Sequence, residues 1–403
     1  MAASAIGVVC GLIGTMFHFG VHEVTAFRGT HPWVLYLLPL AGFVIVSFYK
    51  LTETDGLGTD DIIDAVHEGK RLPILLLPAI FFGTVLTHLC GGSAGREGAA
   101  LQMGGTIGQC MGRTFRLDDR DLRVATLAGM APFFSALFGT PLAATVFAIM
   151  VISIGVIYHV ALYPSLLAAL VAYGVSIHLG VEPTRFTVVV PEQTVGLFVR
   201  VAALGVLCAL VSILFCKLMH GAGHLMKRIK NPWLRVICGG FAVIALTWVF
   251  GTDYNGAGMD IVTRAIEQET VAVPWAFLLK LVFTAVTLAA GFKGGEVVPS
   301  FFVGATFGCA VSPLLGLPVG FGAAIGLAAV FCGVTNCPVA STLLAVELFG
   351  AEGMLYFALA CCLSYMLSGY QGLYSSQTIL YSKLKAQFIN VHTNAYHAGE
   401  KTE

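Results

Sequence analysis

The chain has 403 residues, of which 57% are hydrophobic and only 11% charged, and its formal net charge is zero. Soluble domains carry roughly a quarter of charged residues, so this composition excludes an ordinary soluble protein and indicates a polytopic membrane protein. The sequence gives no indication of a nucleic-acid partner, a cofactor or a metal site.

Apolar segments follow one another along the chain, separated by polar or glycine-rich breaks. Several are shorter than the about 20 helical residues that cross a bilayer. Broken helices are tolerated in a membrane only where their backbone lines a cavity or is buried in protein. We therefore predict an all-α transporter or channel built of broken and tilted helices. In chain order the segments lie at 4–27, 33–49, 73–90, 99–112, 124–152, 154–180, 195–219, 233–250, 273–291, 299–316, 319–332, 338–349 and 354–369.

An internal repeat relates the two halves of the chain at an offset of about 200 residues. Residues 141–148 (Pro-Leu-Ala-Ala-Thr-Val-Phe-Ala) align without gaps on residues 338–345 (Pro-Val-Ala-Ser-Thr-Leu-Leu-Ala). Paired, interrupted helices in two halves indicate an ion site at the repeat interface. Three further matches occur in the same order: 104–108 with 304–308, 58–60 with 258–260, and Glu97 with Glu296 after a slip of one residue.

The distribution of basic residues indicates that the two repeats are inverted. The loop at 113–123 carries four arginines, whereas its repeat partner at 310–320 carries no charge. Since positive charge marks cytoplasmic loops, corresponding loops are expected on opposite sides of the membrane. We predict a first transmembrane repeat at 1–180, a second, inverted repeat at 193–380, and a short polar cytoplasmic tail at 381–403.

Two charged residues stand in the glycine-rich stretch Gly95-Arg96-Glu97-Gly98. Ionisable residues at membrane depth are costly and mark proton or ion pathways. A helix that begins at Glu97 offers free N–H groups to an anion. Its carboxylate can occupy that site when ionised and leave when protonated, which couples protons to anions. The alternative is a structural Arg96–Glu97 pair.

The order and spacing of several motifs resemble those of the CLC family of chloride channels and anion/proton antiporters. The motifs are Gly95-Arg96-Glu97-Gly98, the run from Leu127 to Ala143, the Gly-Gly-x-x-x-Pro at 294–299, and a late tyrosine, Tyr374. The resemblance implies the CLC fold and a homodimer in which each subunit has its own anion pathway. It also implies that the family's cytoplasmic nucleotide-binding domains are absent, because about 25 residues follow Tyr374.

Within that family the chain is most similar to the fluoride/proton antiporter branch. Gly-Gly-Glu-Val-Val-Pro at 294–299 resembles the branch's Gly-Gly-Glu-Val-Thr-Pro, and Asn336-Cys337-Pro338 also matches. The chain departs from the branch at Val298, where a threonine is expected, and at Leu57-Gly58-Thr59, where a methionine is expected. Selectivity for fluoride over chloride therefore stays open at this point.

The resemblance identifies the residues of the expected pathway. The internal proton-transfer glutamate of family antiporters is missing near Val151, so we predict that Glu296 supplies this step; the alternative is a helix-capping carboxylate. Thr59 and Tyr374 are expected to offer hydroxyls to the anion, although Tyr374 also fits an interfacial tyrosine. The remaining residues predicted for the anion site are Gly98, Val297 and Val298. Those predicted along the pore are Gly58, Arg96, Phe301 and Phe302. The alternative role of the two phenylalanines is packing in the core.

The predicted function is the exchange of a small halide, most of all fluoride, for protons across a membrane. The expected location is the plasma membrane of a prokaryotic cell. A chloride/proton antiporter or a passive voltage-gated-type chloride channel is the alternative. A membrane serine hydrolase is a remote one, since Gly91-x-Ser93-x-Gly95 with His88 nearby fits Gly-x-Ser-x-Gly. That motif carries meaning only on a strand-to-helix turn, and both flanks here are apolar helix, so we expect no enzyme.

Overall fold

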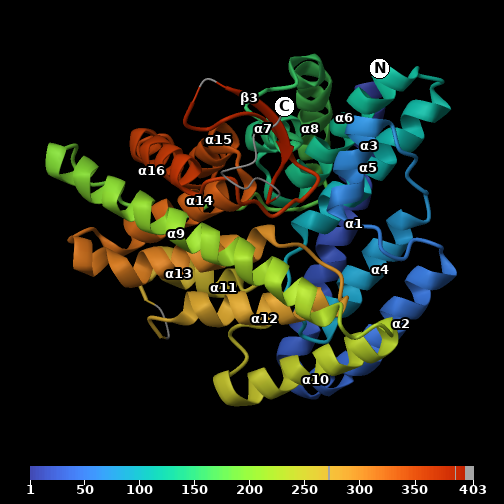
Figure 1. Ribbon diagram of the computed structural model, residues 1–403, viewed down its shortest axis with the longest axis horizontal. Coiled ribbons are helices and arrows are strands. Elements are labelled where there is room, and N and C mark those ends of the chain that lie inside the picture. The colour runs from blue at the N-terminus through green and yellow to red at the C-terminus, as the bar shows by residue number, and fades with distance from the viewer. Residues whose placement is uncertain (271–272, 386, 395–403) are drawn as a thin grey trace.

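The computed structural model describes residues 1–270, 273–385 and 387–394 (Figure 1). Helices make up most of this part of the chain, and three short strands form one small sheet. Seven helices in the described ranges are long and apolar enough to cross a membrane, and six apolar helices are shorter. The all-α membrane fold of broken helices is thus confirmed.

The helices of the first half recur one by one in the second half. The first set is α1 (Ala2–Thr30), α2 (Leu38–Leu51, after a 3-10 turn at Pro32–Leu37), α3 (Thr59–Glu68), α4 (Leu76–Leu89), α5 (Glu97–Thr114), α6 (Asp119–Phe138), α7 (Pro141–Met150) and α8 (Leu162–His178). The second set is α9 (Val195–Met226), α10 (Pro232–Phe250), α11 (Met259–Glu267), α12 (Ala276–Ala290), α13 (Val297–Leu315), α14 (Val319–Thr335), α15 (Pro338–Phe349) and α16 (Met354–Leu367). The predicted repeat therefore extends over whole elements.

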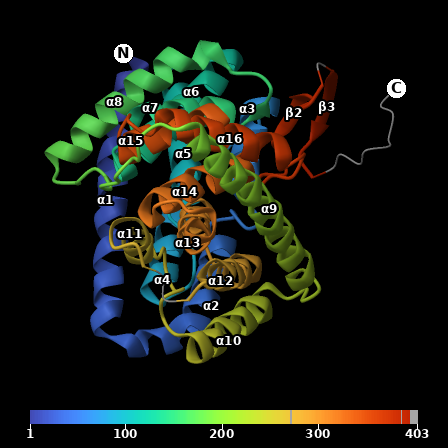
Figure 2. The ribbon, with the colours of Figure 1, turned by 90° about the vertical axis from the view of Figure 1, so that its left-hand side faces the viewer.

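Glycines bring equivalent helix pairs into backbone contact. A Cβ atom on Gly129 of α6 would lie 2.0 Å from the carbonyl oxygen of Gly104 on α5. In the second half a Cβ on Gly326 of α14 would lie 2.2 Å from the carbonyl oxygen of Gly304 on α13. Real side chains cannot approach backbone this closely, so the repeated glycines permit both packings. Figure 2 shows α5, α13 and α14 in the middle, with α1, α8, α9 and α10 around them.

The apolar segment predicted at 124–152 is two helices, so the sequence-based boundary was wrong there. Gly139 ends α6 in the left-handed region (φ 69°), and Pro141 begins α7. The equivalent break has Asn336 at φ 60° and Pro338. A left-handed residue ends a helix and a proline starts the next, while the flanking side chains stay apolar. Hydropathy alone therefore does not reveal the break.

Two aspartates lie in the first turn of α3 and have different partners. Asp61 caps the helix, because the backbone N–H of Gly58 donates to its carboxylate at 2.9 Å. The carboxylate of Asp60 instead accepts from the backbone N–H of Ser376 at 3.0 Å. Asp60 therefore ties the first repeat to the C-terminal segment.

A small sheet at the C-terminal end was not predicted. Its strands are β1 (Ser153–Ile154), β2 (Thr378–Tyr381) and β3 (Phe388–His392), in the order β1-β2-β3. β1 pairs in parallel with β2, and β2 pairs antiparallel with β3. Part of the segment expected as a tail at 381–403 is thus attached to the end of α7, and residues 395–403 lie outside the described residues.

Candidate functional site

The N-termini of α5 and α13 lie next to each other at the centre of the molecule. Gly95 and Gly295 form an antiparallel bridge, with N–H to carbonyl hydrogen bonds of 2.7 and 2.8 Å. A Cβ on Gly295 would lie 2.3 Å from the backbone nitrogen of Gly98, so only glycine fits. The repeats therefore join at equivalent residues running in opposite directions. Two helix N-termini with free N–H groups face one small region.

Glu97 is the first residue of α5, and its side chain is fully buried. Its Oε2 accepts from the backbone N–H of Arg96 at 2.9 Å. Its Oε1 lies 3.6 Å from Arg96 Nε and has no hydrogen-bond partner among the described residues. The carboxyl lies over the backbone of Gly95, where an added Cβ would be 2.5 Å from Oε2. It also lies near the backbone N–H of Val298 on α13. Glu97 therefore belongs to α5 but leans toward the N-terminus of α13.

Glu296 lies one residue earlier in its repeat than Glu97 does, at the position equivalent to Arg96. It is the residue before α13 and is half-buried. A Cβ on Gly98 would lie 3.5 Å from Glu296 Oε2, so this carboxyl leans toward the N-terminus of α5. Each carboxyl thus lies near the first residues of the opposite helix, and we call Glu97 and Glu296 the crossed pair. Val297 and Val298, the first two residues of α13, are both buried beside them.

The predicted hydroxyl donors lie around this centre. Thr59 begins α3, and its Oγ1 accepts from Gln102 Nε2 of α5 at 3.1 Å, next to half-buried Gly58. Tyr374 is 3% exposed, and its hydroxyl has no partner among the described residues. It lies close enough to Glu296, Asp60 and Glu97 for their charges to act on it. An unpartnered buried hydroxyl in acidic surroundings is available to a proton or an anion.

The two phenylalanines that follow Pro299 are packed in the core. Phe301 makes edge contacts with Phe138 and Phe331, with ring centroids 5.9 and 5.1 Å apart. Phe302 packs on Tyr254 at 6.2 Å. Both rings are almost completely buried, so the structure favours their packing role.

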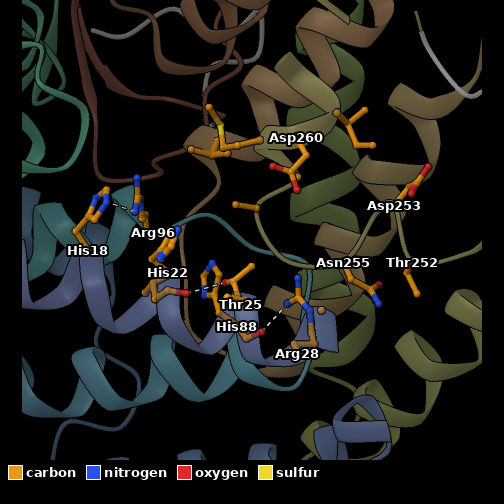
Figure 3. A pocket seen from close by; sticks show the side chains of 18 of the residues that line it. His18, His22, Thr25, Arg28, His88, Arg96, Thr252, Asp253, Asn255 and Asp260 are labelled. Atoms are coloured by element: carbon orange, nitrogen blue, oxygen red, sulfur yellow. Dashed lines mark hydrogen bonds between the residues drawn. The ribbon is translucent and has the colours of Figure 1, made fainter. Parts of the chain in front are cut away.

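A cavity of about 660 Å³ opens onto Glu97 and Val298 (Figure 3). Its walls come from α1, from the end of α4, and from the segment between α10 and α11 with the start of α11. Arg96 lies inside it, where its Nη1 bonds to His18 Nδ1 at 3.2 Å. The polar and charged residues that line it are His18, His22, Thr25, Arg28, His88, Arg96, Glu97, Thr252, Asp253, Asn255, Asp260 and Arg264. The cavity therefore extends to Glu97, the carboxylate that the sequence analysis predicts to act as a gate.

The sequence analysis missed Lys280, a fully buried lysine on α12. Its Nζ donates to the carbonyl oxygens of Tyr254 and Gly256 at 3.1 and 2.6 Å. It also lies 5.2 Å from the centroid of the Phe302 ring. The signal was a lone lysine inside the apolar segment 273–291. Lys280 holds the loop that forms one wall of the cavity.

Lys280→Met is expected to destabilise the protein by about 1–3 kcal/mol, because two buried carbonyl groups lose their donor. Thermal unfolding of the purified protein in detergent measures this change. Lys217→Met on the exposed face of α9 is the matched control and should leave the transition in place. Equal transitions for the two variants would show that Lys280 does not hold the loop.

The serine of the hydrolase-like motif does not meet a catalytic base. Ser93 Oγ bonds to Thr284 Oγ1 at 3.0 Å, and the motif follows the end of α4 rather than a strand. His88 Nδ1 bonds to the carbonyl oxygen of Thr84 at 2.9 Å. The described residues thus lack the nucleophile–base contact that this chemistry requires.

Fold and site together define a polytopic membrane protein of inverted repeats joined at two helix N-termini. The sequence profile of voltage-gated chloride channels matches residues 40–369. The chain belongs to this family, the CLC family, as its motifs indicated. It is 39% identical over 393 residues to the chloride/fluoride channel protein of Pseudomonas syringae pv. tomato, covering 94% of this chain and 86% of that protein.

Solved structures give the same result. The crystal structure of a CLC-type fluoride/proton antiporter matches with a TM-score of 0.91 and 32% identity, over 94% of this chain and 97% of that one. A slow cyanobacterial Cl⁻/H⁺ antiporter matches in fold, with a TM-score of 0.78 and 19% identity over 91% and 93% of the two chains. Among sequence relatives, the H⁺/Cl⁻ exchange transporter ClcA of Vibrio parahaemolyticus is 25% identical over an alignment of 429 positions, which covers 96% of this chain and 91% of ClcA.

Proposed function

We propose that this protein exchanges a small halide for protons across a cell membrane and prefers fluoride to chloride. The observation that carries the proposal is the crossed pair Glu97 and Glu296, each leaning toward the N-terminus of the opposite helix. Anions bind at helix N-termini, so each carboxylate occupies a place that a halide can take. The 39% identical chloride/fluoride channel protein and the 32% identical fluoride/proton antiporter support fluoride as the anion.

Glu97 acts as the gate in this proposal. When ionised, its carboxylate lies at the helix N-termini, where backbone N–H groups and positive dipole ends stabilise it. When protonated, it loses that attraction, leaves toward the cavity and makes room for the anion. Because the same group carries the proton and blocks the anion, the two movements are coupled in opposite directions.

Glu296 takes the inner proton step, since Val151 and its neighbours provide no carboxylate there. Glu296→Gln is expected to reduce fluoride-driven proton movement to the background of protein-free liposomes while the protein still folds. Simultaneous recordings with a fluoride electrode and a pH electrode measure both fluxes. Glu352→Gln, at an exposed glutamate, is the control and should keep the coupling. Unchanged coupling in Glu296→Gln would remove this residue from the mechanism and leave it as a helix cap.

The anion pathway in this proposal runs past Thr59, Gly98, Val297, Val298 and Tyr374. Hydroxyl and backbone N–H donors suit a small halide, because conduction needs several weak sites rather than one tight one. Efflux of fluoride and of chloride from liposomes tests the selectivity. Faster fluoride efflux supports the proposal, whereas chloride flux without a fluoride preference favours a chloride/proton antiporter. Flux that never moves protons favours a passive channel.

The setting of the protein is part of the same proposal. A homodimer in a prokaryotic plasma membrane, with one pathway in each subunit, fits the family and the bacterial relatives. The repeats at 1–180 and 193–380 span the bilayer, and the tail faces the cytoplasm.

A further inference from the structure

His88 is one of the residues that line the cavity. The residue lies near the end of α4 and is fully buried. Its ring Nδ1 is bonded to the carbonyl oxygen of Thr84, whereas Nε2 has no partner within the described ranges. A buried nitrogen without a partner costs free energy unless something from the cavity completes it.

Three cations lie close enough to His88 for their charges to act on its ring. Arg28 donates from Nη1 to the His88 carbonyl oxygen at 2.6 Å, and Arg96 extends into the same cavity. The charges that act most strongly on the His88 ring are those of Arg28, Arg96 and Lys280. Only one of Arg28's side-chain nitrogens has a hydrogen bond to a described residue, so further N–H groups remain for a ligand.

Two of the three carboxylates that line the cavity lie apart from Arg28 and Arg96. Figure 3 shows Arg28, His88 and Arg96 on one side, with Asp253 and Asp260 on the other. Asp253 forms an ion pair with Arg264 at 4.0 Å. Asp260 acts on Arg28 from across the cavity, and Glu97 is paired with Arg96. We define the basic wall as Arg28, His88 and Arg96.

We propose that the basic wall binds the transported halide at a second site, outside the helix N-termini and before the Glu97 gate. The proposal deepens the proposed function and rests on it for the identity of the anion. Arg28 and Arg96 supply charged N–H donors, and His88 completes the site when Nε2 carries a proton. A proton on Nε2 turns the unpartnered acceptor into a donor, and the bound anion offsets the neighbouring positive charges. Anion capture at this wall thus favours uptake of a proton on the same side of the gate.

The test counts fluoride bound to the purified protein by equilibrium dialysis in a Glu97→Gln background, where the gate cannot ionise. Adding Arg28→Met should remove one bound fluoride per chain. Because Arg28 also bonds to the His88 backbone, His88→Leu provides a second variant that leaves that carbonyl in place and removes Nε2. Arg120→Met, at an exposed arginine of α6 that does not line the cavity, is the matched control and should keep the full number.

In liposomes Arg28→Met should raise the fluoride KM measured from the cavity side by about tenfold and leave kcat unchanged. This is expected because the charge of Arg28 acts on fluoride binding, before the ion passes the Glu97 gate. Retention of the full number of bound fluorides in both Arg28→Met and His88→Leu would overturn the site. Failure of wild-type protein to couple fluoride to protons would instead contradict the proposed function, and it is measured separately.

Discussion

Glu97→Gln is expected to abolish proton movement and leave passive halide flux. Glutamine keeps the size of the side chain but neither carries the negative charge nor titrates, so the helix N-termini remain open to the anion. The buried position of Glu97, with Oε1 unpartnered, makes its charge the feature that competes with the anion. Liposomes loaded with fluoride, with external pH recorded during efflux, measure the effect.

The control for Glu97→Gln is Glu23→Gln, which changes a glutamate whose side chain is 77% exposed on α1. It should keep both fluxes and their ratio. Proton movement that persists in Glu97→Gln at the wild-type ratio to halide would contradict the gating role. It would leave Arg96 and Glu97 as a structural ion pair.

Gly129→Ala is expected to have the largest effect on stability, about 3 kcal/mol or more, because overpacking at a helix crossing cannot relax without separating the helices. The added Cβ would lie 2.0 Å from the carbonyl oxygen of Gly104 and 2.8 Å from the nitrogen of Gly108, both of them backbone atoms. Since α5 carries Glu97, separation of α5 and α6 also moves the gate. Thermal unfolding in detergent measures the loss.

The repeat supplies an independent check of the same argument. Gly326→Ala places a Cβ 2.2 Å from the carbonyl oxygen of Gly304 and should destabilise by a similar amount. Gly221→Ala on α9 meets nothing within 4 Å and should stabilise by about 0.5–1 kcal/mol, as alanine does in a helix interior. Similar transitions for Gly129→Ala and Gly221→Ala would refute the close packing of α5 and α6.

Much of the fold was predictable because membrane helices reveal themselves by hydropathy and the chain repeats itself. The predicted segment 338–349 coincides with α15, and 319–332 differs from α14 by three residues at one end. The break at Gly139 was missed because both sides of it are apolar. The small sheet was missed because β1 has only two residues and its partner β2 lies more than 200 positions away.

The candidate site was predictable in its centre but not in its surroundings. Glu97 and Glu296 stood out as charges beside glycines at positions of the repeat that differ by one residue. Their crossing depends on the Gly95–Gly295 bridge, which joins distant segments and leaves no local pattern. Lys280 was visible as a charge in an apolar segment, yet only the folded chain reveals the two carbonyl groups that it holds.

The central claim is that a proton gradient and a halide gradient drive each other through this protein. In sealed liposomes with the membrane voltage clamped and equal fluoride on both sides, an imposed pH gradient should drive fluoride uphill until the two gradients balance. A fluoride electrode records this movement directly. Fluoride that stays at equal concentration under the pH gradient, in protein that otherwise conducts halide, would contradict coupled exchange and identify a channel.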